Sequence, residues 1–323
     1  MRLRSRNRWF GATRTIMRST GIMNNGSLLA TREISSSNDG GTAQAGVGTI
    51  LQEFESKFVG LTLVKQRIAE IAALIALEDR RANLRLAARR PSLHMSFSGN
   101  AGCGKRTVAM HVAEVHHRLG YFKKGQFVAV VRSDLVGRCI SDTARKTRRA
   151  LRRAMGGVLY IEQAHNLVSH SDPADCGQDA LQILLRSMEG RSDDLAVIFA
   201  GFSAPMKAFL LSNPTLRSRI AHHLTFPDYG LPELMQIADR LMERDDYCFG
   251  QGSRDVFEQY LALLMQTRPF ANARSVLNAI DRARQRQARR LRQGPPSAVT
   301  TKALITIEPR DIQSSHLFMI GQY

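Results

Sequence analysis

A glycine-rich segment of the sequence has the residue types and spacing of a phosphate-binding loop. It follows the strand-like run LHMSFSG, opens a helical run, and consists of Gly99, Asn100, Ala101, Gly102, Cys103, Gly104 and Lys105. Glycines let backbone N–H groups turn toward phosphate oxygens at the positive end of a helix. The lysine adds a point charge for the β- and γ-phosphates. The segment therefore predicts a nucleotide-binding P-loop with Lys105 as its main anchor.

The residues after this lysine depart from the usual pattern. A Ser or Thr is expected next, because its hydroxyl is a ligand of Mg²⁺. Arg106 stands there instead, and Thr107 lies about 100° further round the helix, where it cannot take over without distortion. A guanidinium binds no cation: it either occupies the magnesium position itself or turns to solvent and leaves a weak, water-mediated site. Both alternatives predict ATP binding with a weakened Mg²⁺ site.

A second strand-like run, GVLYIE, supplies the acid that such a site needs. Glu162 ends this run and is the candidate metal-binding and catalytic carboxylate, one methylene longer than the usual Asp. Gln163 stands where a second acid usually activates the attacking water. A glutamine can orient a water molecule, but it cannot accept its proton. We therefore expect nucleotide binding with slow or absent hydrolysis.

The order of predicted elements is typical of an α/β protein. Helical periodicity runs from about residue 49 to 88, with a turn at Val59-Gly60-Leu61 and Pro91 closing the second helix. Strand-like runs alternate with helices up to about residue 229, which predicts a doubly wound parallel sheet. After Leu231, amphipathic helices without a strand signal predict a small helical domain. We expect an α/β nucleotide-binding domain at 46–230 and a helical domain at 231–323.

Composition and charge exclude some classes of protein. No apolar run among the 323 residues approaches the roughly 20 residues of a membrane-spanning helix, so no membrane contact is expected. Four scattered cysteines argue against a disulfide scaffold or zinc site and favour a reducing compartment. The net charge of +18 attracts acidic partners without choosing among nucleic acid, lipid and protein.

The first 45 residues have the composition of a leader. They contain seven arginines, and their first acidic residue is Glu33. Such an Arg- and Ser-rich, acid-poor segment is typical of an organelle transit peptide. The alternative is a disordered basic tail. Composition alone does not separate chloroplast from mitochondrion.

Several segments resemble the red-type Rubisco activases, the CbbX/CfxQ family of AAA+ ATPases. In family order they are FVGLTLVKQRI, LHMSFSGNAGCGK, HRLGYFKKGQFVAVVRSDLVG, AMGGVLYIEQAH, SNPTLRSRIAHHLTFPDY and FANARSVLNAIDRARQRQARRL. The resemblance as a whole extends from about residue 50 to 318. The resemblance implies an AAA+ fold with a helical lid and a ring oligomer such as a hexamer. It implies ATP-driven remodelling of the Rubisco large subunit to release inhibitory sugar phosphates, a possible sugar-phosphate effector, and the plastid stroma as the location.

The resemblance also assigns roles to individual residues. Gly60 belongs to the segment lining the adenine pocket, and Arg274, in FANAR, looks like the sensor arginine of the lid. Arg219 looks like the arginine finger extended to a neighbouring subunit, with Arg217 as the other candidate. The alternative for each arginine is a solvated surface charge.

The pore loop that grips the substrate chain in this family corresponds to Arg138, Cys139 and Ile140. Cys139 stands where the family has an aromatic residue, and a thiol offers much less contact area than a ring. Nearby arginines are expected to lower the pKa of Cys139, which leaves a redox role as an alternative.

Three functions remain open. The first is a working remodelling ATPase with unusual site residues. The second is a hydrolysis-impaired subunit that assembles with itself or an active paralogue and donates arginine fingers. The third possibility is nucleic-acid binding by the basic helix at 145–153, against which the lack of interleaved aromatics argues. Arg106, Gln163 and Cys139 affect metal binding, water activation and substrate grip separately, which favours the second function.

Overall fold

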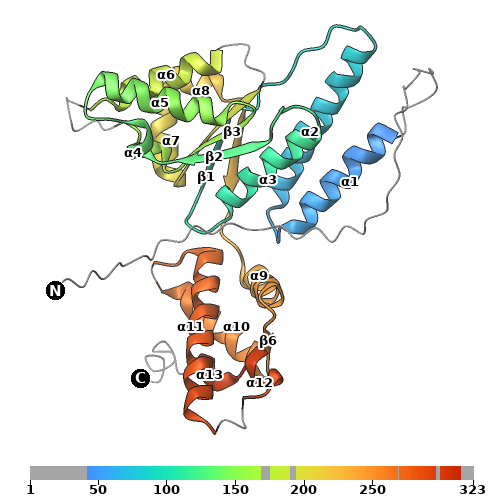
Figure 1. Ribbon diagram of the computed structural model, residues 1–323, viewed down its shortest axis with the longest axis vertical. Coiled ribbons are helices and arrows are strands. Elements are labelled where there is room, and N and C mark those ends of the chain that lie inside the picture. Colours follow the sequence, from blue (N-terminus) through green and yellow to red (C-terminus); the bar gives the residue numbers. More distant parts are fainter. Residues whose placement is uncertain (1–41, 169–174, 190–193, 268, 296–298, 314–323) are drawn as a thin grey trace, which may run out of the picture. The chain divides into compact units, whose positions relative to one another are not determined.

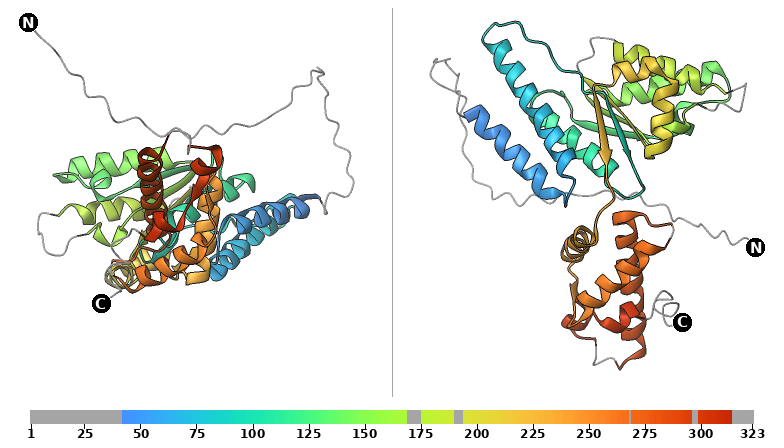
Figure 2. Two further views of the ribbon diagram at one scale, coloured as in Figure 1. Left: turned by 90° about the horizontal axis from the view of Figure 1, so that it is seen from below. Right: turned by 180° about the vertical axis from the view of Figure 1, so that it is seen from behind.

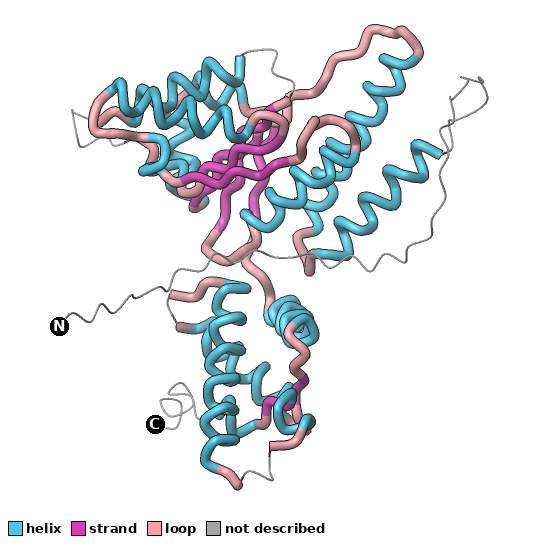
Figure 3. The backbone as a smooth tube through the Cα atoms, in the orientation of Figure 1, coloured by secondary structure: helices cyan, strands magenta, loops and turns pink. Residues whose placement is uncertain are grey.

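Five parallel strands form the centre of the nucleotide-binding part of the chain. The computed structural model describes residues 42–168, 175–189, 194–267, 269–295 and 299–313 (Figure 1). The strands, magenta in Figure 3, lie in the order β2-β3-β4-β1-β5, and every neighbouring pair is parallel. Their bounds are Met95–Gly99 (β1), Gln126–Val130 (β2), Gly157–Ile161 (β3), Leu195–Gly201 (β4) and His222–Phe226 (β5). The predicted parallel α/β sheet is confirmed.

Helices cover both faces of this sheet, as the two views of Figure 2 show. On one face lie α1 (Thr42–Lys57), α2 (Thr62–Asn83) and α3 (Lys105–Arg118). The other face carries α4 (Arg132–Leu135), α5 (Ile140–Ala154), α6 (Gly177–Glu189), α7 (Ser203–Ser212) and α8 (Pro214–Arg219). The short 3₁₀ helix η1 (Ala164–Asn166) follows β3.

The central strands β3 and β4 are buried at every position, because helices cover both faces of the sheet there. Along β3, Val158 and Tyr160 pack in the core beneath α1–α3, whereas Leu159 and Ile161 pack in the core beneath α5–α8. Successive side chains of a strand point to opposite faces. A strand covered on both sides therefore needs apolar residues along its length, whereas the edge strand β5 is exposed at His223 and Thr225.

Helix α2 ends earlier than the sequence predicted. Its periodicity was expected to continue until Pro91, but the helix stops at Asn83. Leu84 and Leu86 are 64% and 53% exposed, so a longer helix would bury little apolar surface. The guanidinium of Arg81 donates to the Ala87 carbonyl instead, at 2.8 and 3.1 Å, and fixes a non-helical turn.

The C-terminal part consists mainly of helices, as predicted. They are α9 (Leu231–Arg244), α10 (Ser253–Gln266), α11 (Asn272–Gln293), α12 (Thr301–Ile305) and α13 (Pro309–Gln313). This helical part also contains one short strand pair that the sequence did not indicate, in which β6 (Cys248–Phe249) pairs in parallel with β7 (Thr306–Ile307). The Gln287 amide donates to the Thr306 carbonyl at 3.0 Å and the Ser253 hydroxyl to Ile307 at 2.8 Å. Strands of only two residues are too short to produce an alternating pattern in the sequence, so this pair could not be predicted.

Two further observations, the start of α1 and the character of the helices, bear on the sequence predictions. Helix α1 begins at Thr42, so it overlaps the leader expected over residues 1–45, of which 1–41 lie outside the described residues. Within the described part of the chain, no helix combines the length and apolar character needed to cross a bilayer.

Two buried histidines make the stability of this fold depend on pH. His94 accepts a hydrogen bond from the Val197 N–H at 3.1 Å, and burial lowers its pKa to about 4. The Nδ1–H of His116 donates to the Val112 carbonyl at 2.6 Å, and complete burial lowers its pKa to about 4 as well. Its Nε2 has no hydrogen-bond partner among the described residues.

We predict that the free energy of unfolding falls as the pH is lowered from about 6.5 toward 4. Both pKa values lie below the ordinary 6.5, so in this range the unfolded chain binds more protons than the folded one. Each imidazole then removes up to about 1.4 kcal/mol per pH unit. Urea unfolding at several pH values measures this slope, and His116→Met should flatten it. An unchanged slope in that variant would contradict the assignment.

Candidate nucleotide site

The loop between β1 and α3 has the backbone geometry of a phosphate cradle. Gly102 and Gly104 have φ values of 71° and 92°, a region that costs other residues free energy. Helix α3 begins at Lys105, so its first N–H groups, which have no partner within the helix, face the loop. An anion in this loop would be bound by N–H groups and by the positive end of the helix.

Lys105 is folded onto its own loop. Its ammonium donates to the carbonyl oxygens of Gly99 and Asn100 at 2.8 and 2.7 Å. Cys103, fully buried beside it, donates its thiol hydrogen to Asn100 at 2.9 Å, and burial raises the pKa of this thiol. A phosphate can draw the ammonium away from the carbonyls, because charge-assisted hydrogen bonds are the stronger ones.

Arg106 and Glu162 meet at the next position of the site. The guanidinium Nη1 lies 3.5 Å from the Glu162 Oε2, with side chains 58% and 38% exposed. Gln163 follows, with the left-handed φ of 49°, and its side-chain oxygen accepts a hydrogen bond from Asn166 at 3.1 Å. The cation-binding acid expected from the sequence therefore faces an arginine.

These groups line one cavity of about 450 Å³. Residues 101–107, Glu162 and Gln163 form one side, and Arg274 of α11 joins them. Ile237, Leu241, Ala273 and Leu277 add an apolar wall suited to a flat ring. Among the described residues, a second cavity of about 550 Å³ shares Glu162 and Gln163 but contains no P-loop residue. Its Arg132 and Lys146 already donate to carbonyls within the chain.

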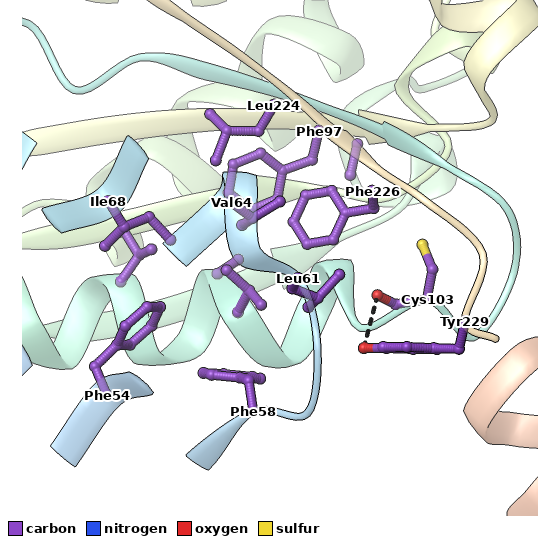
Figure 4. Close-up of a cluster of buried hydrophobic side chains, with 14 of the residues drawn as sticks. Phe54, Phe58, Leu61, Val64, Ile68, Phe97, Cys103, Leu224, Phe226 and Tyr229 are labelled. Atoms are coloured by element: carbon purple, nitrogen blue, oxygen red, sulfur yellow. Dashed lines mark hydrogen bonds between the residues drawn. The ribbon is translucent and has the colours of Figure 1, made fainter. Parts of the chain in front are cut away.

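Gly60 lies outside the lining of the nucleotide cavity. It sits in the turn between α1 and α2, where the sequence predicted a break, and Leu61 anchors this turn in the core around Phe97 and Phe226 (Figure 4). A Cβ at Gly60 would collide with the carboxylate of Glu233 in α9. The residue thus permits a close approach of α9, whereas its contact with adenine stays a prediction.

Asn272 ties the P-loop to the lid, although the sequence did not single it out. Its amide donates to Asp228 at 2.7 Å and to the Ala101 carbonyl at 3.1 Å, and its oxygen accepts from the Tyr229 N–H at 3.0 Å. Asp228 in turn accepts from Asn100 of the loop at 2.8 Å. The side chain of Asn272 is only 1% exposed, whereas its partner Asp228 and the loop residue Asn100 lie at the surface.

Two further contacts complete this junction. The Tyr229 hydroxyl donates to the Cys103 carbonyl at 3.4 Å, the dashed line in Figure 4. A Cβ at Gly102 would collide with the carbonyl oxygen of Ala271, which precedes α11. The P-loop therefore contacts the start of α11, the helix that carries Arg274, directly.

Comparison with known proteins identifies the family. The model of the AAA family, ATPases associated with various cellular activities, matches residues 95–228, and that of the AAA lid domain matches 231–318. The chain is 48% identical to the chromosomal protein CbxX of Cupriavidus necator over 85% of this chain and 87% of that protein. It is 45% identical to the chloroplastic ribulose bisphosphate carboxylase/oxygenase activase of Cyanidioschyzon merolae, over 85% and 94%.

The chain belongs to the CbbX/CfxQ family of AAA+ ATPases. The resemblance found in the sequence is thereby confirmed. A solved AAA domain of FIGL-1 shares the fold, with a TM-score of 0.55 and 15% identity over 80% of each chain. Nucleotide binding follows from membership of the AAA ATPases.

The two candidate finger arginines of this CbbX-type chain lie in different surroundings. Arg219, the last residue of α8, forms an ion pair with Glu189 at the end of α6, and its Nε is buried without a hydrogen-bond partner among the described residues. Arg217 is exposed on the same short helix. Arg219 would have to leave Glu189 before reaching another subunit, and the choice between the two stays open.

The predicted pore-loop residues lie together on the surface where α5 begins. Arg138, Cys139 and Ile140 are all exposed, as a substrate-gripping loop requires. The pKa of the Cys139 thiol is lowered, but the expected cause is wrong. A hydrogen bond with Ser141, at 3.2 Å, is the main cause, followed by the Asp142 N–H, and no arginine contributes.

A weak signal for Asn272 was present in the sequence. Asparagine is one of the few residues that adopts a left-handed backbone readily, and the φ of Asn272 is 47°. An asparagine directly before a predicted helix also suggests a local hydrogen-bonding role. Neither signal shows that its partners are Asp228 and the P-loop, because those lie far away in the chain.

We predict that Asn272→Gly loosens the junction between the lid and the P-loop. Glycine keeps the positive φ but removes the amide, which leaves the buried Tyr229 N–H without its acceptor, while the exposed Asp228 keeps Asn100. An unsatisfied buried group of this kind should lower the free energy of unfolding by about 1–3 kcal/mol. Urea unfolding of the full chain measures the loss.

A reciprocal exchange is the matched control for this prediction. Asn272→Asp alone places two carboxylates together, whereas adding Asp228→Asn restores one amide and one carboxylate at the junction, with the two groups in exchanged positions. The double variant should be more stable than Asn272→Asp. Equal stability of the two would show that the pairing contributes nothing.

Proposed function

We propose that this chain is a nucleotide-binding, hydrolysis-impaired subunit of a Rubisco-activase-like AAA+ ring. One observation carries the proposal: the phosphate cradle and Lys105 are intact, while Arg106 faces Glu162 and Gln163 follows it. Binding of ATP needs the first group of residues, and rapid hydrolysis needs the second. We keep residues 46–230 and 231–323 as the proposed nucleotide-binding and lid domains.

The Mg²⁺ site is proposed to be weak, because the donor set fits the ion poorly. Magnesium takes oxygen ligands in a near-octahedral arrangement, and the hydroxyl normally supplied after the lysine is replaced by a guanidinium 3.5 Å from Glu162. No group of three His, Cys, Asp or Glu side chains that could hold a metal gathers within the described residues. Glu162 remains as a single carboxylate beside a fixed positive charge.

Water activation is proposed to be the second weakness. Gln163 is exposed, and its oxygen is occupied by Asn166, so it is held by a neighbour on its own turn. Its amide can position a water molecule but cannot take a proton at neutral pH. Turnover then depends on a group from elsewhere in the ring.

The Rubisco large subunit is the proposed partner. Support comes from the chloroplastic activase of Cyanidioschyzon merolae, which is 45% identical over nearly its whole length. We propose that the chain assembles with itself or an active paralogue, as a hexamer or another ring, and offers Arg219 or Arg217 to the neighbouring site. The plastid stroma is the proposed location, with the mitochondrion as the alternative. A sugar-phosphate effector is part of the proposal.

Two other functions have less support. A fully active remodelling ATPase would need Arg106 and Gln163 to do the work of a hydroxyl and a carboxylate. Nucleic-acid binding would use the basic side chains of α5, two of which are engaged within the chain. Arg145 pairs with Asp142 at 2.5 Å, and Lys146 donates to the Ser133 and Val136 carbonyls at 3.1 Å.

We predict that Lys105→Ala abolishes the protection of the fold by nucleotide. Because ATP or ADP binds the folded chain only, it raises the free energy of unfolding by about 2.7 kcal/mol at a hundredfold excess over Kd. Thermal unfolding with and without nucleotide measures this. Lys57→Ala, at an exposed ion pair with Glu114, is the control and should keep the protection. Absence of any shift in the unaltered chain would reject the proposed function.

We predict that Arg106→Thr together with Gln163→Glu raises ATP turnover by about 100-fold or more, because both changes act on the same transition state. Remodelling of Rubisco should become complete only when Cys139→Tyr is added. Phosphate release by the purified chain measures turnover. Rapid hydrolysis by the unaltered chain without a partner would instead support the fully active ATPase.

A further inference from the structure

Arg106 places a positive charge inside the nucleotide cavity that does not depend on a metal ion. Among the described residues, the cavity is lined by the cationic side chains of Lys105, Arg106 and Arg274 and by a single acidic one, that of Glu162. The lining is therefore positively charged before any ligand arrives. A polyphosphate would find three cations within one cavity.

The ion pair with Glu162 is weak enough to be exchanged for a phosphate. Its atoms are 3.5 Å apart and both side chains are substantially exposed, so water screens their attraction. Exposed pairs of this kind contribute about 0–1 kcal/mol. A guanidinium bound to phosphate through two parallel N–H donors forms stronger, charge-assisted hydrogen bonds.

A divalent cation is at a disadvantage at the same place. It would need a hydroxyl ligand that Arg106 has replaced, and it would lie next to the guanidinium, where like charges repel. Thr107 lines the cavity but starts about 100° further round α3. Arg106, the residue that weakens metal binding, thus also supplies a positive charge in place of the metal ion.

We propose that this site binds nucleoside di- and triphosphates without a divalent cation, with Arg106 as the counter-ion of the terminal phosphates. Glu162 holds the guanidinium in place when nucleotide is absent and releases it to the ligand. The inference rests on the proposed nucleotide binding. It goes beyond weak metal binding, because it predicts that removal of Mg²⁺ costs the complex little.

Isothermal titration of the full chain with ATP, in excess Mg²⁺ and in excess EDTA, tests the proposal. The two Kd values should differ by less than about threefold. Arg106→Gln should weaken binding in EDTA by roughly tenfold to a hundredfold, because it removes a charge-assisted contact. Arg118→Gln, at the far end of the same helix, is the matched control and should bind like the unaltered chain.

Arg106→Thr provides the opposite test. It restores the hydroxyl and removes the competing charge, so Mg²⁺ should now tighten ATP binding about tenfold or more. Because Arg106 is exposed, these variants should fold, and their melting temperatures without nucleotide check this.

Two results would overturn the inference while leaving nucleotide binding intact. The first is that the unaltered chain binds ATP tenfold or more tightly with Mg²⁺ than with EDTA. The second is that Arg106→Gln binds in EDTA as tightly as the unaltered chain. No binding under either condition would instead reject the proposed function, and the inference with it.

Discussion

Strand β1 is paired along its length with β4 on one side and β5 on the other, and this pairing fixes the nucleotide site. Gly99, the last residue of β1, lies opposite Phe226, the last residue of β5. The loops that leave these two strands therefore start side by side. One is the P-loop, and the other carries Asp228 and Tyr229 to the lid. The contacts among Asn100, Asp228 and Asn272 follow from this register.

The same pairing connects the P-loop to the lid. Asn272 is held by the P-loop and by the segment after β5, and it begins the helix that carries Arg274. Helix α11 is anchored beyond this point, since Val276, Ala279, Ile280 and Ala283 are buried at helical spacing. A displacement of the P-loop can therefore move α11 as a rigid body.

The three positions that the proposed function makes responsible for altered chemistry lie on the surface of the fold. Arg106 and Gln163 are exposed, and Cys139 lies on the surface at the start of α5. Substitutions there cost little stability, because no buried contact depends on them. On the proposed function, metal binding, water activation and substrate grip can therefore vary separately without loss of the fold. This explains how a chain 45–48% identical to its relatives can differ from the usual pattern at the reacting atoms.

Elements whose signals are local could be predicted from the sequence. Glycine spacing, periodicity and side-chain chemistry act over a few positions. They therefore sufficed to predict the P-loop, the strands and the turn at Gly60. They also sufficed to find the three residues that depart from the usual pattern, Arg106, Gln163 and Cys139. Tertiary structure alone decided the end of α2, the β6–β7 pair, the attachment of Arg219 to Glu189, the cause of the lowered Cys139 pKa, and the meeting of Arg106 with Glu162. It also revealed Asn272 as the link between the P-loop and the lid. Each of these depends on which distant segments the sheet register brings together, and on whether a side chain finds a buried surface or water, neither of which is encoded in local pattern.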